Sequence, residues 1–144
     1  MQTVSKAIDV TVSSKNDNSV NPGNITSNFI EIKNLNSKEI EVDIWLIAVD
    51  EKSQPLLYWC EFEEKTNERK RLQFPLVLSP KESRNINLNF RVPPQAQPGL
   101  YKYEILIDYS DKPPIRRPQQ LRVLRSDITS QQKTKPEFCL EPST

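Results

Sequence analysis

The stretch VPPQAQPGLYKYEILIDY, from Val92 to Tyr109, decides the fold of this chain. Its prolines and the pair Pro98-Gly99 indicate a tight turn directly before a strand. In that strand every second residue from Tyr101 to Tyr109 is apolar, which buries one face and leaves the other in water. A tight crossover that leads into a core strand is typical of an immunoglobulin-like β-sandwich.

Alternation with a period of two residues recurs along the chain, with turn residues between the segments. It is clearest at 40–48, where the apolar face alternates with Glu41 and Asp43. Pro118 places the last strand at a sheet edge or a bulge, because proline has no N–H to donate. The eight predicted strands cover approximately residues 8–12, 30–34, 40–48, 56–62, 71–78, 86–92, 101–109 and 115–124.

The connections between these segments are also predicted from their composition. Residues 16–23 form a polar loop, and the charged run 61–71 forms a solvated hairpin. The fold class is therefore all-β, an immunoglobulin-like Greek-key β-sandwich of about seven or eight strands with an extended C-terminal tail. We assign residues 1–125 to the sandwich and residues 126–144 to a linker and tail, for which pairing with a neighbouring chain is one of two expectations.

The composition argues against catalysis. The sequence contains no histidine and two glycines, which excludes histidine-based catalysis and a phosphate-cradling loop. We expect no enzyme, and no catalytic, cofactor-binding or metal-ligating residues. The spacing of Asp17, Asn18 and Asn21 fits no EF-hand loop, and the pair Glu61 and Glu63 has no predicted cleft.

Membrane insertion is not expected either, because the longest apolar run, Ile44–Val49, is six residues long. The first six residues lack the basic and apolar regions of a secretory signal, so we expect a cytoplasmic protein. Two widely separated cysteines, Cys60 and Cys139, do not suggest a disulfide framework.

Four stretches resemble the immunoglobulin-like NEW3-type modules that are appended to bacterial glycosidases and surface proteins. They are Pro22-Gly23, Phe29–Asn34, Pro80–Pro93 and Gly99 with Tyr101, and the resemblance covers residues 7–125. It implies a spacer, an adhesive domain or part of a larger assembly, with no common active site. Tyr101 also resembles a tyrosine corner, in which the phenol bonds back to the backbone.

The tail ends in PEFCLEP, which resembles the opening strand of another such domain. It is either the start of a second domain or a peptide that adds a strand to a neighbour. Phe138 and Leu140 are its candidate contact residues.

Charge and aromatic residues suggest where contacts form. Residues 1–68 hold six lysines against twelve acidic residues, whereas residues 69–144 hold fourteen basic against seven acidic residues. These unlike halves favour polar docking faces, and the near-zero total argues against nucleic acid. Alternation directs Trp45 and Ile47 outward, and Tyr58 and Trp59 follow on the next predicted strand. The alternative is that the charged run or the tail covers this sheet.

The function predicted from these features is a non-catalytic structural subunit. It docks on other protein subunits of a larger assembly through its edge strands, outer aromatics and tail, and a phage-tail-like contractile machine is one example by fold analogy. A carbohydrate-binding or adhesive accessory module is the alternative, because tryptophan and tyrosine serve both protein hot spots and sugar stacking. A chaperone-like strand donor or acceptor is a further one.

Overall fold

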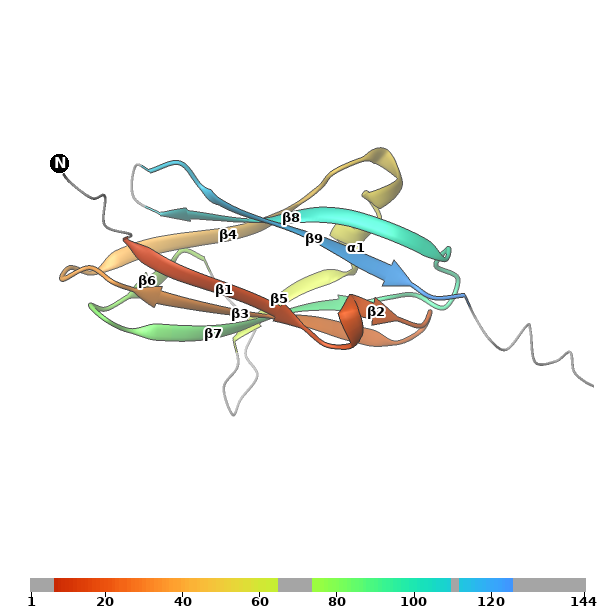
Figure 1. Cartoon of the computed structure of the whole chain (residues 1–144), viewed down its shortest axis with the longest axis horizontal. Helices are drawn as coiled ribbons and strands as arrows, with labels where there is room; N and C mark the ends of the chain where they lie inside the picture. Colours follow the sequence, from red (N-terminus) through yellow and green to blue (C-terminus); the bar gives the residue numbers. More distant parts are fainter. Residues whose placement is uncertain (1–6, 65–73, 110–111, 126–144) are drawn as a thin grey trace, which may run out of the picture.

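The computed structural model describes residues 7–64, 74–109 and 112–125, and these form two β-sheets packed face to face (Figure 1). Sheet A contains, in spatial order, β1 (Ile8–Ser14), β3 (Ile25–Asn34), β7 (Ser83–Arg91) and β5 (Cys60–Glu64). Sheet B contains β2 (Ser19–Val20), β9 (Ile115–Val123), β8 (Gly99–Tyr109), β4 (Ile40–Ala48) and β6 (Leu76–Leu78). One short helix, α1 (Leu56–Trp59), and two 3₁₀ turns, η1 (Asn16–Asn18) and η2 (Glu51–Ser53), complete the described elements.

The strand order is that of a Greek-key sandwich. In sheet A, β3 pairs with β7 and not with its sequence neighbour β4, which lies in sheet B. The first strand divides: β1 pairs antiparallel with β3, and β2 crosses to sheet B, where it pairs parallel with the end of β9. The predicted all-β, immunoglobulin-like sandwich is confirmed.

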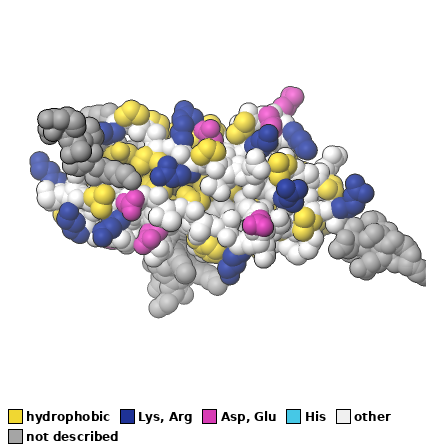
Figure 2. All heavy atoms as spheres, viewed as in Figure 1, with side chains coloured by type: hydrophobic (Ala, Val, Ile, Leu, Met, Phe, Trp, Pro, Cys, Tyr) yellow, Lys and Arg dark blue, Asp and Glu magenta, His cyan; other side chains and the backbone are white. Residues whose placement is uncertain are grey.

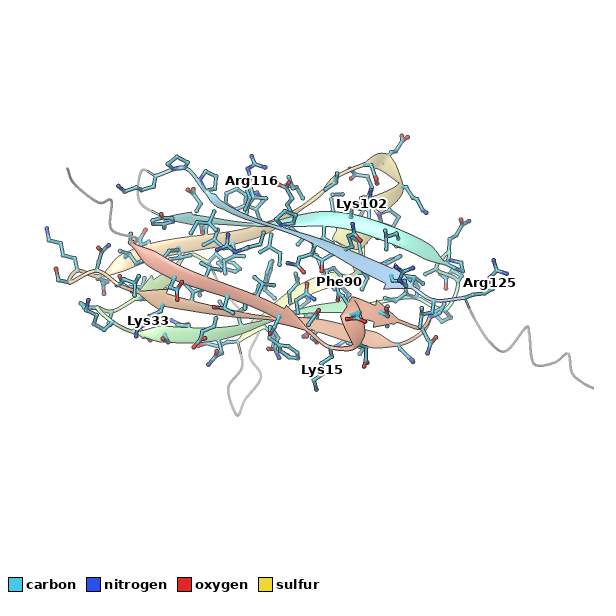
Figure 3. The ribbon with its side chains drawn as sticks, in the orientation of Figure 1. Lys15, Lys33, Phe90, Lys102, Arg116 and Arg125 are labelled. Atoms are coloured by element: carbon cyan, nitrogen blue, oxygen red, sulfur yellow. The ribbon has the colours of Figure 1, made fainter. Side chains whose placement is uncertain are left out.

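Alternating strand residues fill the space between the sheets, as the sequence predicts. The ring of Phe90 on β7 meets the ring of Tyr103 on β8, with centroids 5.2 Å apart, and Figure 3 shows Phe90 pointing between the two layers. These two side chains and ten aliphatic ones are almost completely buried. The ten are Ile8, Ile30, Ile32, Leu56, Leu78, Ile86, Leu88, Ile105, Ile107 and Leu121.

The strand predicted at 56–62 is wrong in its first half. Pro55 has a helical φ of −57° and opens α1, so the strand β5 begins at Cys60. Proline at a helix start loses no hydrogen bond, and a short apolar run does not distinguish a helical turn from a strand. Leu56 is the buried residue of this turn and anchors it in the core.

Two predicted connections also need correction. The loop predicted at 16–23 contains η1, whose three residues all have positive φ, and the strand β2. The described strands on either side of the charged run 61–71 do not pair as a hairpin, because β5 lies in sheet A and β6 lies in sheet B. Of the strand predicted at 71–78, residues 76–78 form β6, and residues 65–73 lie outside the described residues.

A closed ring of three side-chain hydrogen bonds lies inside the sandwich. Asn18 Nδ2 donates to Tyr103 Oη at 2.9 Å, the Tyr103 hydroxyl donates to Asn28 Oδ1, and Asn28 Nδ2 donates back to Asn18 Oδ1 at 2.9 Å. All three side chains are buried. Asn18 also donates to the carbonyl of Gln120 at 2.7 Å, so the ring ties η1 to both sheets. Asparagine tolerates the left-handed backbone of η1 better than most residues.

Burial raises the pKa of the Tyr103 phenol, which predicts a loss of stability in alkali. In the unfolded chain a tyrosine ionises near pH 10, whereas the folded protein keeps this phenol protonated. The free energy of unfolding is therefore retained below pH 10 and falls above it, by up to about 1.4 kcal/mol per pH unit. Urea unfolding between pH 8 and 11 tests this against Tyr103→Phe, which starts less stable but declines less steeply. An equal decline of the free energy of unfolding with pH in the two proteins would contradict the prediction.

The predicted tyrosine corner is present. The hydroxyl of Tyr101 donates to the backbone carbonyl of Gln97 at 2.6 Å, which ties β8 to the turn before it. A second polar anchor is the buried Asn34, whose Nδ2 donates to the carbonyls of Lys38, Leu78 and Ser79 at 2.9 to 3.1 Å. These bonds join the end of β3 in sheet A to the end of β6 in sheet B.

Candidate docking surfaces

The outer face of sheet B carries an exposed apolar patch. Trp45 and Ile47 on β4 point away from the core, as their parity predicts, and Trp45 is 39% exposed. Trp45 pairs across the strands with Leu106 on β8, while Ile47 and Pro118 flank Glu104 in the next row. We call this surface the outer patch. Its members are Trp45, Ile47, Val49, Leu106 and Pro118.

Sequence reasoning missed three of these residues. Leu106 stands between the core positions Ile105 and Ile107, so its outward parity is hidden in a continuous apolar run. It is nevertheless 5% exposed, because its neighbours on the outer face cover it. A strict count of parity from Tyr101 finds Leu106, but its position opposite Trp45 requires the strand register.

Charged side chains border the outer patch with opposite signs on its two sides. On β9, Arg116 forms an ion pair with Glu104, with Nη1 and Oε1 2.7 Å apart, and Arg122 is exposed further along the strand. On β4, Glu41 and Asp43 precede Trp45 and are exposed. The face therefore changes from basic over β9 to acidic over the first half of β4.

A shallow groove of about 490 Å³ adjoins the outer patch on the β9 side. It lies over β8 and β9, between Val49 and Pro118, and Lys102, Glu104 and Gln120 contribute polar groups to its lining. Figure 3 shows Lys102 and Arg116 on this upper sheet. The groove combines apolar walls with both charges and a neutral amide.

The sequence predicts Tyr58 and Trp59 on the strand that follows the one with Trp45, but both belong to the helix α1. Tyr58 is 89% exposed. Trp59 packs against Tyr101 with ring centroids 5.2 Å apart, so its main contacts are within the sandwich. Phe138 and Leu140 lie outside the described residues.

Basic residues gather along β9 and its flanks. The segment 112–125 contains five basic residues and no acidic one, and Figure 2 shows Lys and Arg side chains interleaved with hydrophobic ones on this side of the molecule. The strand β5, at the edge of sheet A that is farthest from β1, holds three glutamates. Two of these are neutralised in part, because Glu64 pairs with Arg84 at 2.9 Å and Glu61 with Arg91 at 3.9 Å. The positive charge along β9 is therefore more pronounced than the negative charge along β5.

The edge of sheet B at β9 is open over most of its length. The strand β2 pairs with Arg122 and Val123, and among the described residues no strand pairs with Ile115–Leu121 on that side. Pro118 lies within this open part, as predicted, and removes one N–H donor from it. Arg117 bridges the two sheets weakly here, with Nη2 3.4 Å from the carbonyl of Val10.

The described residues offer little for metal or redox chemistry. No group of three or more His, Cys, Asp or Glu side chains is placed to hold a metal ion within residues 7–64, 74–109 and 112–125. Cys60 has a free, half-buried thiol whose pKa is raised by burial. In the same described residues, no helix has the length and apolar character needed to cross a membrane.

The sequence matches no protein-family model and no curated protein. The fold is similar to part of a family 123 glycoside hydrolase from Clostridium perfringens, with a TM-score of 0.66 and 13% identity over 84% of this chain and 28% of that chain. It is similar to a FixG-related protein from Vibrio parahaemolyticus, with a TM-score of 0.55 and 9% identity over 83% of this chain and 98% of that one.

A third similar structure is a Salmonella alpha-2-macroglobulin, with a TM-score of 0.52 and 12% identity over 84% of this chain and 7% of that one. Identities this low show the fold alone. Together with the strand order, these similarities define the chain as an immunoglobulin-like β-sandwich.

Proposed function

We propose that this protein is a non-catalytic interaction module that docks on another protein through the outer patch of sheet B. The observation that supports the proposal is Trp45, a tryptophan that stays 39% exposed in the middle of a sheet, next to Ile47 and Leu106. A large aromatic side chain on a solvent-facing sheet costs free energy unless something covers it. Tryptophan is also enriched among the residues of interface hot spots.

The finer parts of the proposal concern the setting. We infer that the partner belongs to a larger cytoplasmic assembly, of which a contractile tail-like machine is one example. We infer also that the sandwich is related in form to NEW3-type accessory modules. The charged border of the outer patch supports a protein partner, because acidic residues on one side and basic residues on the other fix the orientation of a docked protein.

A carbohydrate partner is the second candidate. The observation that favours it is the position of Trp45 beside the ion pair of Glu104 and Arg116. An indole ring offers a flat apolar surface to a sugar ring, and carboxylate and guanidinium groups bond to hydroxyls. A glycan array with the purified full chain distinguishes this candidate, since glycan retention that Trp45→Ser removes would replace the protein-docking proposal.

Trp45→Ser is expected to lose the specific partner in affinity purification from the native source. Removal of a hot-spot tryptophan costs at least about 2 kcal/mol, which is roughly a thirtyfold loss of affinity. Quantitative mass spectrometry of the co-purified proteins measures this. The matched control is Ile25→Ser, because Ile25 is also exposed, at 54%, but lies on β3 in sheet A.

Proteins that Trp45→Ser loses and Ile25→Ser retains support the proposal. If both variants retain the same proteins as the wild type, the outer patch is not the docking surface and the proposal is wrong. Circular dichroism of both variants confirms that neither substitution has unfolded the sandwich.

A further inference from the structure

We propose that residues 137–141 of this chain, EFCLE, occupy the groove beside the outer patch of their own sandwich and compete with the partner. This inference rests on the proposed function, because it assigns to the tail the same surface on which the partner docks. It also specifies the chemistry of that partner: a short extended peptide with two apolar side chains two residues apart and acidic residues beside them.

The spacing of the apolar residues fits an extended segment. Phe138 and Leu140 are separated by one residue, so an extended backbone places both on the same face. The groove has apolar walls at Val49 and Pro118, and Glu104 in its lining pairs across the strands with Ile47 of the outer patch. Its volume of about 490 Å³ is sufficient for two such side chains. Burial of Phe138 and Leu140 there also covers Val49 and Pro118, two of the apolar residues that sheet B exposes.

The charges of the segment match those of the β9 side. Glu137 and Glu141 flank the apolar pair, and the groove and its border carry Lys102 and Arg122 as exposed cations. The acidic residue of the groove, Glu104, is already paired with Arg116. The segment 112–125 has no acidic residue that would repel the two glutamates.

The length of the tail and its starting point allow this contact. Arg125, the last described residue, directly follows β9 and lies at the end of the sandwich in Figure 3. Gln120, in the groove, is five residues before it, which is about 17 Å along a strand. Residues 126–136 extend to about 36 Å, so residues 137–141 reach the groove. A segment tethered so closely has an effective concentration of about millimolar, so a weak contact is enough to hold it.

The test uses the tryptophan emission of the full chain. The sequence has two tryptophans, Trp45 and Trp59, so Trp59→Phe leaves Trp45 as the one reporter and keeps an aromatic ring against Tyr101. In this background we compare Phe138→Ser/Leu140→Ser with the matched control Ile128→Ser, which removes an apolar residue of the tail outside the segment. We expect the double variant to shift the Trp45 emission to longer wavelength and to raise acrylamide quenching at least twofold.

The control should leave both readings unchanged. Glu137→Lys/Glu141→Lys should reproduce the double variant, and added salt should weaken the wild-type contact, since exposed charges are screened. Equal emission and quenching in the double variant and its parent would overturn the proposal. If the difference in Trp45 emission between the double variant and its parent disappears on dilution, the groove is occupied by the tail of a second copy. That result would also overturn the proposal as stated.

The failures of the inference and of the proposed function can be distinguished. If the tail variants do not affect Trp45 but Trp45→Ser still loses its partner, the docking function stands and the tail inference is wrong. If the tail variants expose Trp45 but Trp45→Ser loses no partner, the tail covers a surface that serves no docking. If both are right, Phe138→Ser/Leu140→Ser in the otherwise unchanged chain recovers more partner than the wild type.

Discussion

Asn28→Ala is expected to lower the free energy of unfolding by about 3 kcal/mol. The substitution removes both bonds that Asn28 contributes to the buried ring, and it leaves the Tyr103 hydroxyl without its acceptor and the Asn18 carbonyl without its donor. Each buried polar group that loses its partner costs about 1 to 3 kcal/mol. Water does not compensate easily, because the side chains of all three residues are buried. Urea unfolding at pH 7 measures the change.

The matched control for this prediction is Asn85→Ala. Asn85 is also on a strand of sheet A, but its side chain is exposed on the outer face, so its loss should change stability by less than about 0.5 kcal/mol. A double-mutant cycle of Asn28→Ala with Tyr103→Phe should show that the two losses do not add, because the second substitution removes a group that the first has already left unpaired. Equal effects of Asn28→Ala and Asn85→Ala would contradict a structural role for the ring.

The strands could be predicted because each has its own alternation. Ile40, Val42 and Ile44 share one side of β4, and no long-range information is needed to say that this side is buried. The turn before β8 is equally local, which is why the tyrosine corner at Tyr101 follows from the sequence. Local alternation does not determine which strands become neighbours, so it predicts a hairpin between β5 and β6 although these strands lie in different sheets.

The buried ring could not be predicted because its members are distant in sequence. Asn18 and Tyr103 are 85 residues apart, and Asn18 stands in a run of polar residues that is typical of a solvated loop. Its side chain is buried because the chain crosses from β1 in sheet A to β2 in sheet B, and η1 lies at this crossing. A turn with three positive φ values has no alternation that would distinguish it from an ordinary loop.

The candidate site was predicted in part for the same reason. The parity of β4 identifies Trp45 and Ile47 as outward residues. Their partners Leu106 and Pro118 come from strands that lie far along the chain, and the register that aligns them is set by tertiary pairing. The sequence predicts Tyr58 and Trp59 on a strand, whereas both belong to the helical turn α1, where Tyr58 is exposed and Trp59 packs on Tyr101.

The short helix α1 holds a fixed place in the core although it is four residues long. An isolated turn of this length is not stable in water. Its position therefore depends on tertiary contacts, and the fully buried Leu56 provides the main one. The same turn sets the exposure of Tyr58 and the packing of Trp59 on Tyr101. A substitution at Leu56 therefore tests whether its burial holds α1 against the core.

Leu56→Ala is expected to lower the free energy of unfolding by about 2 to 5 kcal/mol, which is the range for a buried leucine that leaves a cavity. The adjacent Leu57→Ala is the matched control, since Leu57 is 38% exposed and belongs to the same turn. It should cost less than about 1 kcal/mol, because little apolar surface returns to water. In a Trp45→Phe background, where Trp59 is the one tryptophan, the emission should shift to longer wavelength in Leu56→Ala and stay unchanged in Leu57→Ala. If the two variants are equally stable, Leu56 does not contribute to the stability of the core. The packing of the segment between β4 and β5 must then depend on other residues.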